Sequence, residues 1–192
     1  MPYCSQCGQP TESRIPDGED RPRHVCTACG VIHYQNPKMI VGCIIEHHGR
    51  VLLCKRAIEP RRGYWTVPAG FLELGESAMA GALRETREEA CARVRIIAPY
   101  AHFDVPHIGQ AYIIYRASLL DLDFAPGTES LEVKLVGLSE IPWSEIAFPV
   151  VRHSLELLSE DLDKGAFRSH QGALVREEGR YVLRDHLAVT LG

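Results

Sequence analysis

Three carboxylates crowd into one short segment of this chain, and they constrain its fold more than any other feature. The segment reads RETREEA from Arg84 to Ala90. On an α-helix, where each residue advances by about 100°, Glu85, Glu88 and Glu89 share one face, while small and apolar side chains occupy another. Like charges on one face repel, so the segment is either a solvated acidic surface or a site for cations.

A longer pattern around the segment separates these two interpretations. The chain reads G-x5-E-x7-R-E-x2-E-E from Gly70 to Glu89, and the stretch YWTVPAGF leads into it. This pattern resembles the signature of the Nudix hydrolase family, G-x5-E-x7-R-E-U-x-E-E-x-G-U, in which U is a bulky aliphatic residue. Thr86, Cys91 and Ala92 depart from it. Cys91 replaces a glycine, which predicts a helix end that does not need the conformational freedom of glycine.

The resemblance implies a metal-dependent reaction at this helix. In the family the helix binds Mg²⁺ or Mn²⁺, which bridge to a diphosphate, neutralise charge and activate a water molecule. Carried over to this sequence, the resemblance implies four metal ligands, the side chains of Glu85, Glu88 and Glu89 and the carbonyl of Gly70. Two further residues of the pattern, Glu76 and Arg84, are expected to orient the loop and the helix.

The reaction also needs a general base, and the sequence leaves more than one candidate. Glu85 is the first. The second is a glutamate of the stretch GTESLEV, Glu129 or Glu132, because loop glutamates reach over the metal site in similar ADP-ribose-cleaving enzymes. An alternative interpretation is that Glu129 and Glu132 are ordinary exposed charges of a loop and a strand edge. We take Glu132 as the catalytic candidate from this stretch.

Basic and aromatic residues near the pattern are candidates for binding substrate. Arg56 and Arg61 precede it and are expected to contact phosphates, although Arg61 also reads as a solvated charge. Phe103 and Tyr112 alternate with apolar residues on β segments, so they either stack on a ring of the substrate or belong to the core. The same region carries two histidines that either contact substrate or stay exposed, His102 and His107.

The cysteines predict a second, structural metal site. Two matched pairs, Cys4-x2-Cys7 and Cys26-x2-Cys29, are each followed by glycine, with a spacing typical of a zinc ribbon. Such turns let four thiolates converge on one tetrahedral Zn²⁺ and leave no open coordination position, so the site is structural. Disulfides are the alternative, which a reducing compartment disfavours.

Hydropathy patterning predicts an α/β fold. The helix that carries the G-x5-E-x7-R-E-x2-E-E pattern, called the box helix below, is expected over about residues 77–91. A second long helix is expected over 149–158. Strands are expected at 39–45, 51–57, 93–105, 110–120 and 131–138. This order fits a mixed sheet with helices on both faces, which is also the α/β/α sandwich that the Nudix resemblance implies. The stretch 159–172 reads as a polar linker, and 173–185 as a hairpin around Glu178 and Gly179 or a flexible tail.

Length and charge bound the organisation of the chain. Its 192 residues support a zinc ribbon over 1–34, a Nudix domain over 35–160 and a C-terminal tail or hairpin over 161–192. The net charge of −4 argues against a nucleic-acid partner. No apolar run reaches membrane-spanning length, and the N-terminus lacks the features of a secretory signal. We expect a cytoplasmic homodimer that acts on a small nucleotide substrate.

Further motifs narrow the substrate. The stretches HYQNPK, RAIEPRRGYWTVPAGF, SLEV and IPWSEIAF resemble a zinc-ribbon Nudix subgroup related to ADP-ribose and FAD pyrophosphatases. This resemblance implies cleavage of the diphosphate in FAD or ADP-ribose. The SQPWPFPxS stretch of NADH pyrophosphatases has no counterpart here, which disfavours reduced NAD. The alternatives are a pyrophosphatase for NADH or another dinucleotide, and a module that senses a nucleotide without cleaving it.

Overall fold

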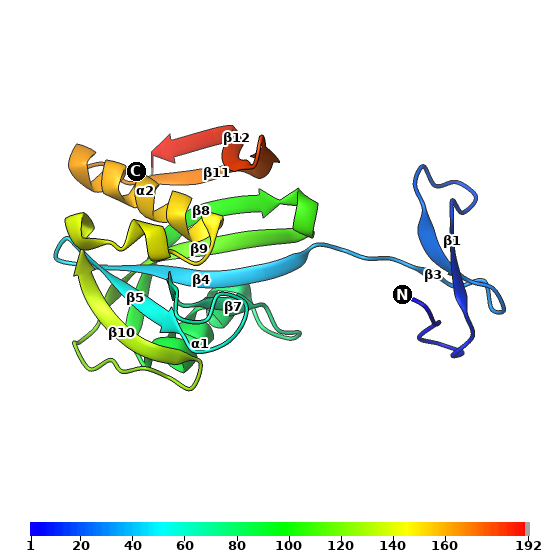
Figure 1. The fold of residues 1–192 in the computed structure, drawn as a ribbon, viewed down its shortest axis with the longest axis horizontal. Coiled ribbons are helices and arrows are strands. Elements are labelled where there is room, and N and C mark those ends of the chain that lie inside the picture. Colours follow the sequence, from blue (N-terminus) through cyan, green and yellow to red (C-terminus); the bar gives the residue numbers. More distant parts are fainter. Residues whose placement is uncertain (191–192) are drawn as a thin grey trace. The chain divides into compact units, whose positions relative to one another are not determined.

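The computed structural model describes residues 1–190 and divides the chain into two compact units, Met1–Asn36 and a second unit from Pro37 onward (Figure 1). The break falls at Asn36-Pro37, where proline interrupts regular structure. Each unit has its own sheet. Within residues 1–190, no helix combines the length and apolar character that crossing a bilayer requires.

The first unit is a three-stranded antiparallel sheet in the order β1-β2-β3. Its strands are β1 (Thr11–Arg14), β2 (Arg23–Cys26) and β3 (Ile32–His33). One CxxCG turn precedes β1, and the other connects β2 to β3. Their glycines, Gly8 and Gly30, have φ of 72° and 74°, and each donates its backbone N–H to the carbonyl of the first cysteine of its turn. Only glycine adopts this conformation without a steric cost, so it closes both turns.

The second unit is built on one mixed sheet of nine strands, with the main path β10-β5-β4-β9-β8-β11-β12. Two short strands lie off this path, β6 on β5 and β7 on β4. The pairs β4 with β9 and β8 with β11 are parallel, and the others are antiparallel. The bounds are β4 (Lys38–His47), β5 (Arg50–Arg56), β6 (Trp65–Thr66), β7 (Ala69–Phe71), β8 (Val94–Val105), β9 (Gln110–Leu119), β10 (Ser130–Gly137), β11 (Arg168–Glu177) and β12 (Arg180–Thr190).

Two helices, α1 (Ala78–Ala90) and α2 (Pro149–Lys164), cover opposite faces of this sheet (Figure 1). Successive side chains of β4 point to opposite faces of the sheet. Ile44 accordingly packs in the core under α2, whereas its neighbours Cys43 and Ile45 pack in the core under α1. Three short 3₁₀ helices connect elements, η1 (Pro106–Ile108), η2 (Leu138–Glu140) and η3 (Trp143–Glu145). The predicted α/β/α sandwich with a mixed sheet is therefore confirmed.

The box helix begins and ends almost where the sequence predicted. Ser77 is the N-cap, and its hydroxyl accepts from the backbone N–H of Ala80 at 3.2 Å. The expectation for Cys91 was wrong, because this residue adopts the left-handed conformation, with φ of 48°, in which helices usually place glycine. Because its Cβ crowds the following carbonyl oxygen in this conformation, Cys91 caps the helix at a steric cost of about 1 kcal/mol relative to glycine.

The linker-like interpretation of residues 159–172 was also wrong. Asp161 and His170, both fully buried, are hydrogen-bonded at 2.9 Å between Oδ2 and Nε2. Tyr100 and Arg168 also donate to the Asp161 carboxylate, and His170 Nδ1 lies 3.1 Å from His186 Nε2. Burial opposes ionisation of Asp161, but these hydrogen bonds outweigh it and lower its pKa. This network ties α2, β8 and the β11–β12 hairpin together.

Replacing Asp161 by Asn is expected to lower the free energy of unfolding by about 3 kcal/mol, because a buried charged network loses its central acceptor. Urea unfolding monitored by circular dichroism measures the effect. Asp163→Asn, on the exposed face of the same helix, is the matched control and should change stability by less than about 0.5 kcal/mol. Equal stability of the two variants would contradict this account of the network.

Candidate active site and metal-binding residues

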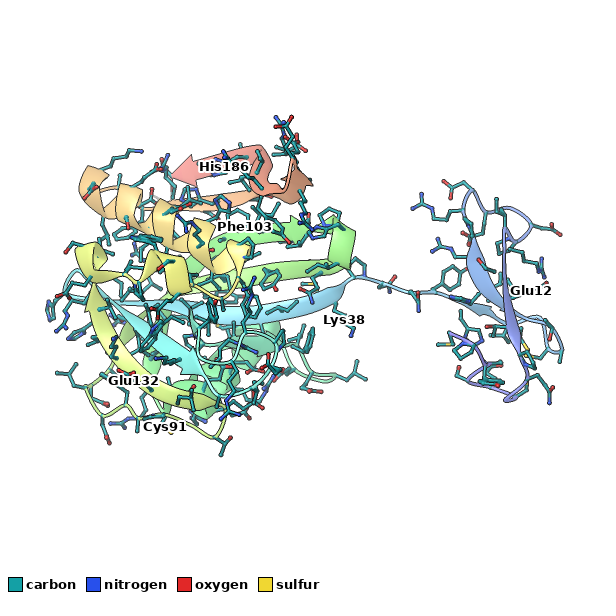
Figure 2. The ribbon with its side chains drawn as sticks, in the orientation of Figure 1. Glu12, Lys38, Cys91, Phe103, Glu132 and His186 are labelled. Atoms are coloured by element: carbon teal, nitrogen blue, oxygen red, sulfur yellow. The ribbon has the colours of Figure 1, made fainter. Side chains whose placement is uncertain are left out.

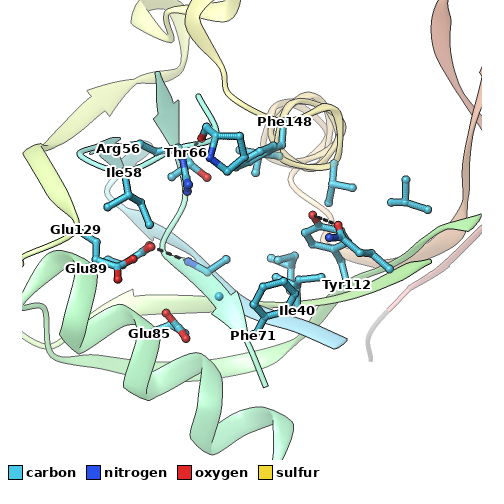
Figure 3. A pocket seen from close by; sticks show the side chains of 18 of the residues that line it. Ile40, Arg56, Ile58, Thr66, Phe71, Glu85, Glu89, Tyr112, Glu129 and Phe148 are labelled. Carbon is cyan, nitrogen blue, oxygen red and sulfur yellow. Dashed lines mark hydrogen bonds between the residues drawn. The ribbon is translucent and has the colours of Figure 1, made fainter. Parts of the chain in front are cut away.

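A cavity of about 950 Å³ lies in the second unit, and its two ends differ in chemistry (Figure 3). Carboxylates from α1 and from the loop before β10 line one end. Apolar and aromatic side chains from β4, β8, β9, α2 and the β11–β12 hairpin line the other. Figure 3 shows Glu85, Glu89 and Glu129 grouped on one side and Tyr112 on the opposite side. The cavity thus joins an anionic end to an aromatic end.

The predicted carboxylates line the anionic end, and two of them are held against backbone. Glu89 is buried, and its Oε2 accepts from the backbone N–H of Ala69 at 3.0 Å. Burial raises the pKa of Glu89 to about 8 and also raises that of Glu85. A Cβ on Gly70 would lie 2.4 Å from Oε1 of Glu85, so only glycine lets this carboxylate approach the loop.

Arg84 balances the negative charge of the helix. Its guanidinium contacts Glu76 at 2.7 Å, Glu85 at 2.7 Å and Glu88 at 2.9 Å, and it also donates to the carbonyl of Phe71 at 3.1 Å. Glu76 in turn accepts from the backbone N–H of Glu73 at 2.8 Å. Arg84 and Glu76 therefore connect the loop after β7 to α1, as expected of residues that orient the carboxylates.

A glycine holds the loop before β10 against the end of α1. The backbone N–H of Gly127 donates to the carbonyl of Glu89 at 3.0 Å, and a Cβ on Gly127 would lie 1.6 Å from the carbonyl oxygen of Glu88. Any larger residue is excluded there. The carbonyl of Glu129 accepts from the N–H of Ala57 at 2.8 Å, and the Glu129 side chain lines the cavity.

The aromatic end presents ring surface. The Tyr112 hydroxyl donates to Gln110 at 2.9 Å, and the Tyr181 hydroxyl lies 3.2 Å from His107 Nε2. Both polar tips therefore have partners, which leaves the rings to pack against an apolar group. Arg56 lies between the two ends, with its Nε donating to the Pro60 carbonyl at 2.9 Å and its guanidinium over the Phe148 ring.

In the first unit, the four predicted cysteines converge. Their Sγ atoms all lie within 4.8 Å of one another, with Cys7 at 3.5 Å from both Cys26 and Cys29. A tetrahedral ion with Zn–S bonds of about 2.3 Å requires S···S separations of about 3.8 Å, whereas a disulfide requires about 2.05 Å. Backbone N–H groups of Cys29 and Ala28 donate to the sulfur of Cys26 and lower its pKa to about 6. The cluster therefore fits one tetrahedral metal ion.

Comparisons with known proteins agree with this arrangement. A family model described as the NUDIX domain matches residues 36–154, and one described as Nudix N-terminal, a zinc ribbon, matches residues 2–35. This chain belongs to the Nudix hydrolase family. The crystal structure of a NUDIX hydrolase from Nitrosomonas europaea is 55% identical, covers 91% of this chain and 99% of that chain, and superposes with a TM-score of 0.87.

Curated relatives are more distant. The human "NAD(P)H pyrophosphatase NUDT13, mitochondrial" is 27% identical over 73% of this chain and 38% of the relative. An ADP-ribose pyrophosphatase of Methanocaldococcus jannaschii is 26% identical over 57% of this chain and 67% of the relative. This chain thus spans well under half the length of the human relative it matches.

The Nudix carboxylates suit a hard divalent cation. Among residues 1–190, the four cysteines are the one group of three or more ligand residues whose atoms all lie within 4.8 Å of one another, so the oxygens of Glu85, Glu88 and Glu89 are spread more widely. The Glu88 carboxylate accepts a hydrogen bond from Arg84, and the Glu89 carboxylate accepts one from the backbone N–H of Ala69. Even so, buried carboxylates with raised pKa values gain most from a neighbouring cation, and oxygen donors are what Mg²⁺ and Mn²⁺ prefer.

Five candidate residues for catalysis or substrate binding lie outside the cavity lining: Arg61, His102, Phe103, His107 and Glu132. Glu132 lies on β10, where it pairs with Lys55 in the ladder and contacts Lys134, so Glu129 takes its place as the glutamate at the site. Phe103 (Figure 2) is fully buried in the core under α2, so its interpretation as a stacking residue is corrected to a core residue. Arg61 is exposed and packs over Tyr64.

Sequence reasoning missed the wall that the C-terminal region contributes. Leu174 and Tyr181 come from the β11–β12 hairpin, and Phe148, Pro149, Val150 and Val151 from the start of α2. The stretch ALVREEGRYVLRD was expected to form a hairpin or a flexible tail, and nothing in it indicated which strand a hairpin would join. That pairing, between β11 and β8, joins residues about 70 positions apart.

Proposed function

We propose that this chain hydrolyses the diphosphate bridge of a nucleoside diphosphate derivative, FAD or ADP-ribose, in a reaction that depends on Mg²⁺ or Mn²⁺. The observation that carries the proposal is that one cavity joins the carboxylates of α1 to an aromatic end. A substrate with a diphosphate next to a nucleoside matches both ends. The similarity to an ADP-ribose pyrophosphatase supports the same substrate class.

In this proposal, Glu85, Glu88 and Glu89, with the Gly70 carbonyl, hold the divalent cation. When bound, the cation neutralises phosphate charge, polarises phosphorus and lowers the pKa of the attacking water. Arg56 contacts a phosphate from the middle of the cavity, where its contact with Pro60 fixes the guanidinium. Arg84 positions the carboxylates through its contacts with Glu85 and Glu88.

Glu129 is the proposed general base, and Glu85 is the second candidate. The water oxygen attacks one phosphorus of the P–O–P bridge, and the base accepts a proton from this water. The bond from that phosphorus to the bridging oxygen breaks, and the other phosphate leaves. FAD then gives AMP and FMN, and ADP-ribose gives AMP and ribose 5-phosphate. Glu132 has no part in this scheme because it lies outside the cavity.

Two alternative functions, a pyrophosphatase for NADH or another dinucleotide and a nucleotide sensor without activity, would give different results in the substrate assay described below. The name of the human relative points to NAD(P)H, whereas the missing SQPWPFPxS stretch disfavours it. A nucleotide sensor would bind without cleaving, but it would have no need of every box carboxylate. The cytoplasmic location and the homodimer stay predictions from the sequence, and the name of the human relative places that protein in mitochondria.

The substrate assignment is tested by a panel assay on the purified chain. FAD, ADP-ribose, NADH, diadenosine polyphosphates and nucleoside triphosphates are incubated with Mg²⁺ or Mn²⁺, and products are separated by chromatography. We expect FAD or ADP-ribose to give AMP, and a chelator to stop the reaction. The assignment fails if both stay intact with either metal while NADH or the triphosphates are cleaved readily.

The metal-ligand assignment predicts the effect of two variants. Glu88→Gln and Glu89→Gln each should lower turnover by about 10³-fold, because a ligand of the catalytic cation is lost. Glu156→Gln, on the surface of α2, is the control and should keep wild-type turnover. Near-normal rates for either box variant would remove these residues from the metal site, and circular dichroism checks that the variants remain folded.

The choice of base predicts a contrast between two nearby glutamates. Glu129→Gln should lower kcat by about 10²-fold or more, as expected when a general base is lost. Glu132→Gln should leave kcat within about twofold, because this side chain lies outside the cavity. The opposite ranking would return Glu132 to the catalytic role, and no effect in either variant would leave Glu85 as the base.

We further propose that Cys4, Cys7, Cys26 and Cys29 hold one structural Zn²⁺. Metal analysis of protein prepared with zinc present should find about one zinc per chain. Cys26→Ser should lose zinc and stability before it loses turnover, because the site has no open position for chemistry. Cys91→Ser, an exposed cysteine of the other unit, is the control. Zinc-free protein with oxidised thiols would refute the proposal.

A further inference from the structure

The wall of the cavity is completed by a segment that lies beyond the matched Nudix region. That region ends at residue 154, whereas Leu174 and Tyr181 lie on the β11–β12 hairpin. The hairpin turns at Glu178 and Gly179, and its Leu174 is fully buried in the core under α2. The end of the cavity opposite the carboxylates therefore depends on residues outside the family pattern.

The hairpin is a fixed part of the second unit. Strand β11 pairs in parallel with β8, from His170 opposite Ala101 to Ala173 opposite Asp104. The buried contact between His170 and Asp161 joins the hairpin to α2, and the contact between His170 and His186 joins β11 to β12. The wall that the hairpin presents to the cavity is thus held in place before any ligand binds.

Tyr181 closes the aromatic end against the connection between β8 and β9. Its hydroxyl lies 3.2 Å from His107 Nε2, and the two rings are 5.5 Å apart at 48°. Tyr112 lies on the same end of the cavity with its own hydroxyl bonded to Gln110. The lining residues that come from β8, η1, β9, α2 and the hairpin are all uncharged. Such a surface favours an apolar, planar group over a second phosphate.

We propose that the β11–β12 hairpin is a specificity element, in which Tyr181 packs against the aromatic ring of the nucleotide while its diphosphate lies at the carboxylates. This inference rests on the proposed function for the orientation of the substrate. Tyr181 acts in binding only, since the carboxylates at the other end carry the chemistry. The hairpin thereby selects substrates that carry a planar heterocycle and disfavours sugar phosphates that lack one.

Binding of reaction products tests the inference without requiring turnover. Isothermal titration calorimetry in Mg²⁺ buffer measures the Kd of AMP, FMN and ribose 5-phosphate for wild type, Tyr181→Ala, Tyr181→Phe and Leu187→Ala. Tyr181→Ala should weaken AMP or FMN about tenfold, because the ring contact is lost. Tyr181→Phe keeps the ring and should stay within about threefold. Leu187→Ala, an exposed residue of β12 outside the cavity, is the matched control and should bind as wild type.

The kinetic counterpart separates binding from chemistry. With whichever panel substrate is cleaved, Tyr181→Ala should raise KM about tenfold and leave kcat within about twofold. The inference is overturned if wild type binds neither AMP nor FMN, if Tyr181→Ala binds both like wild type, or if ribose 5-phosphate loses as much affinity as they do. If FAD and ADP-ribose are not cleaved but AMP binding still depends on Tyr181, the proposed function fails and the hairpin assignment stands.

Discussion

The contacts of Arg84 make the crowded carboxylates of α1 compatible with a folded domain. One guanidinium reaches Glu76, Glu85 and Glu88 and the carbonyl of Phe71. Burial raises the pKa of Glu85 even beside this cation, so without Arg84 the ionised Glu85 and Glu88 would repel each other with no compensating charge. The loop after β7, the helix and the acidic end of the cavity all take their positions from this set of charge-assisted hydrogen bonds.

Features that depend on the spacing of nearby residues, such as the box helix and the four-cysteine cluster, were predictable from the sequence. The box helix needs only the 3.6-residue period and a serine N-cap, and the four-cysteine cluster needs only two CxxCG turns brought together by one short sheet. The sandwich followed from the order of strands and helices. In each case the signal lies in residues that are close along the chain.

Features that depend on distant pairing were not predictable. Residues 159–172 look polar because Asp161, Arg168 and His170 satisfy one another inside the protein, and single-residue polarity cannot distinguish that from exposure. Phe103 and Tyr112 have the same local pattern, yet Phe103 is buried in the core under α2 and Tyr112 lines the cavity. Glu129 and Glu132 differ in location: the loop residue lines the cavity, where Gly127 holds its loop against α1, and the strand residue does not.

Gly127 has a wider consequence for how this site tolerates change. Because its Cα lies against the carbonyl of Glu88, the loop that carries Glu129 and the end of α1 form one mechanical block. Adding or removing one residue between Ala125 and Glu129 is expected to shift the glutamate out of register with the helix. Insertions are therefore expected to disturb the site less in segments that do not span this contact, such as the turn of the β11–β12 hairpin.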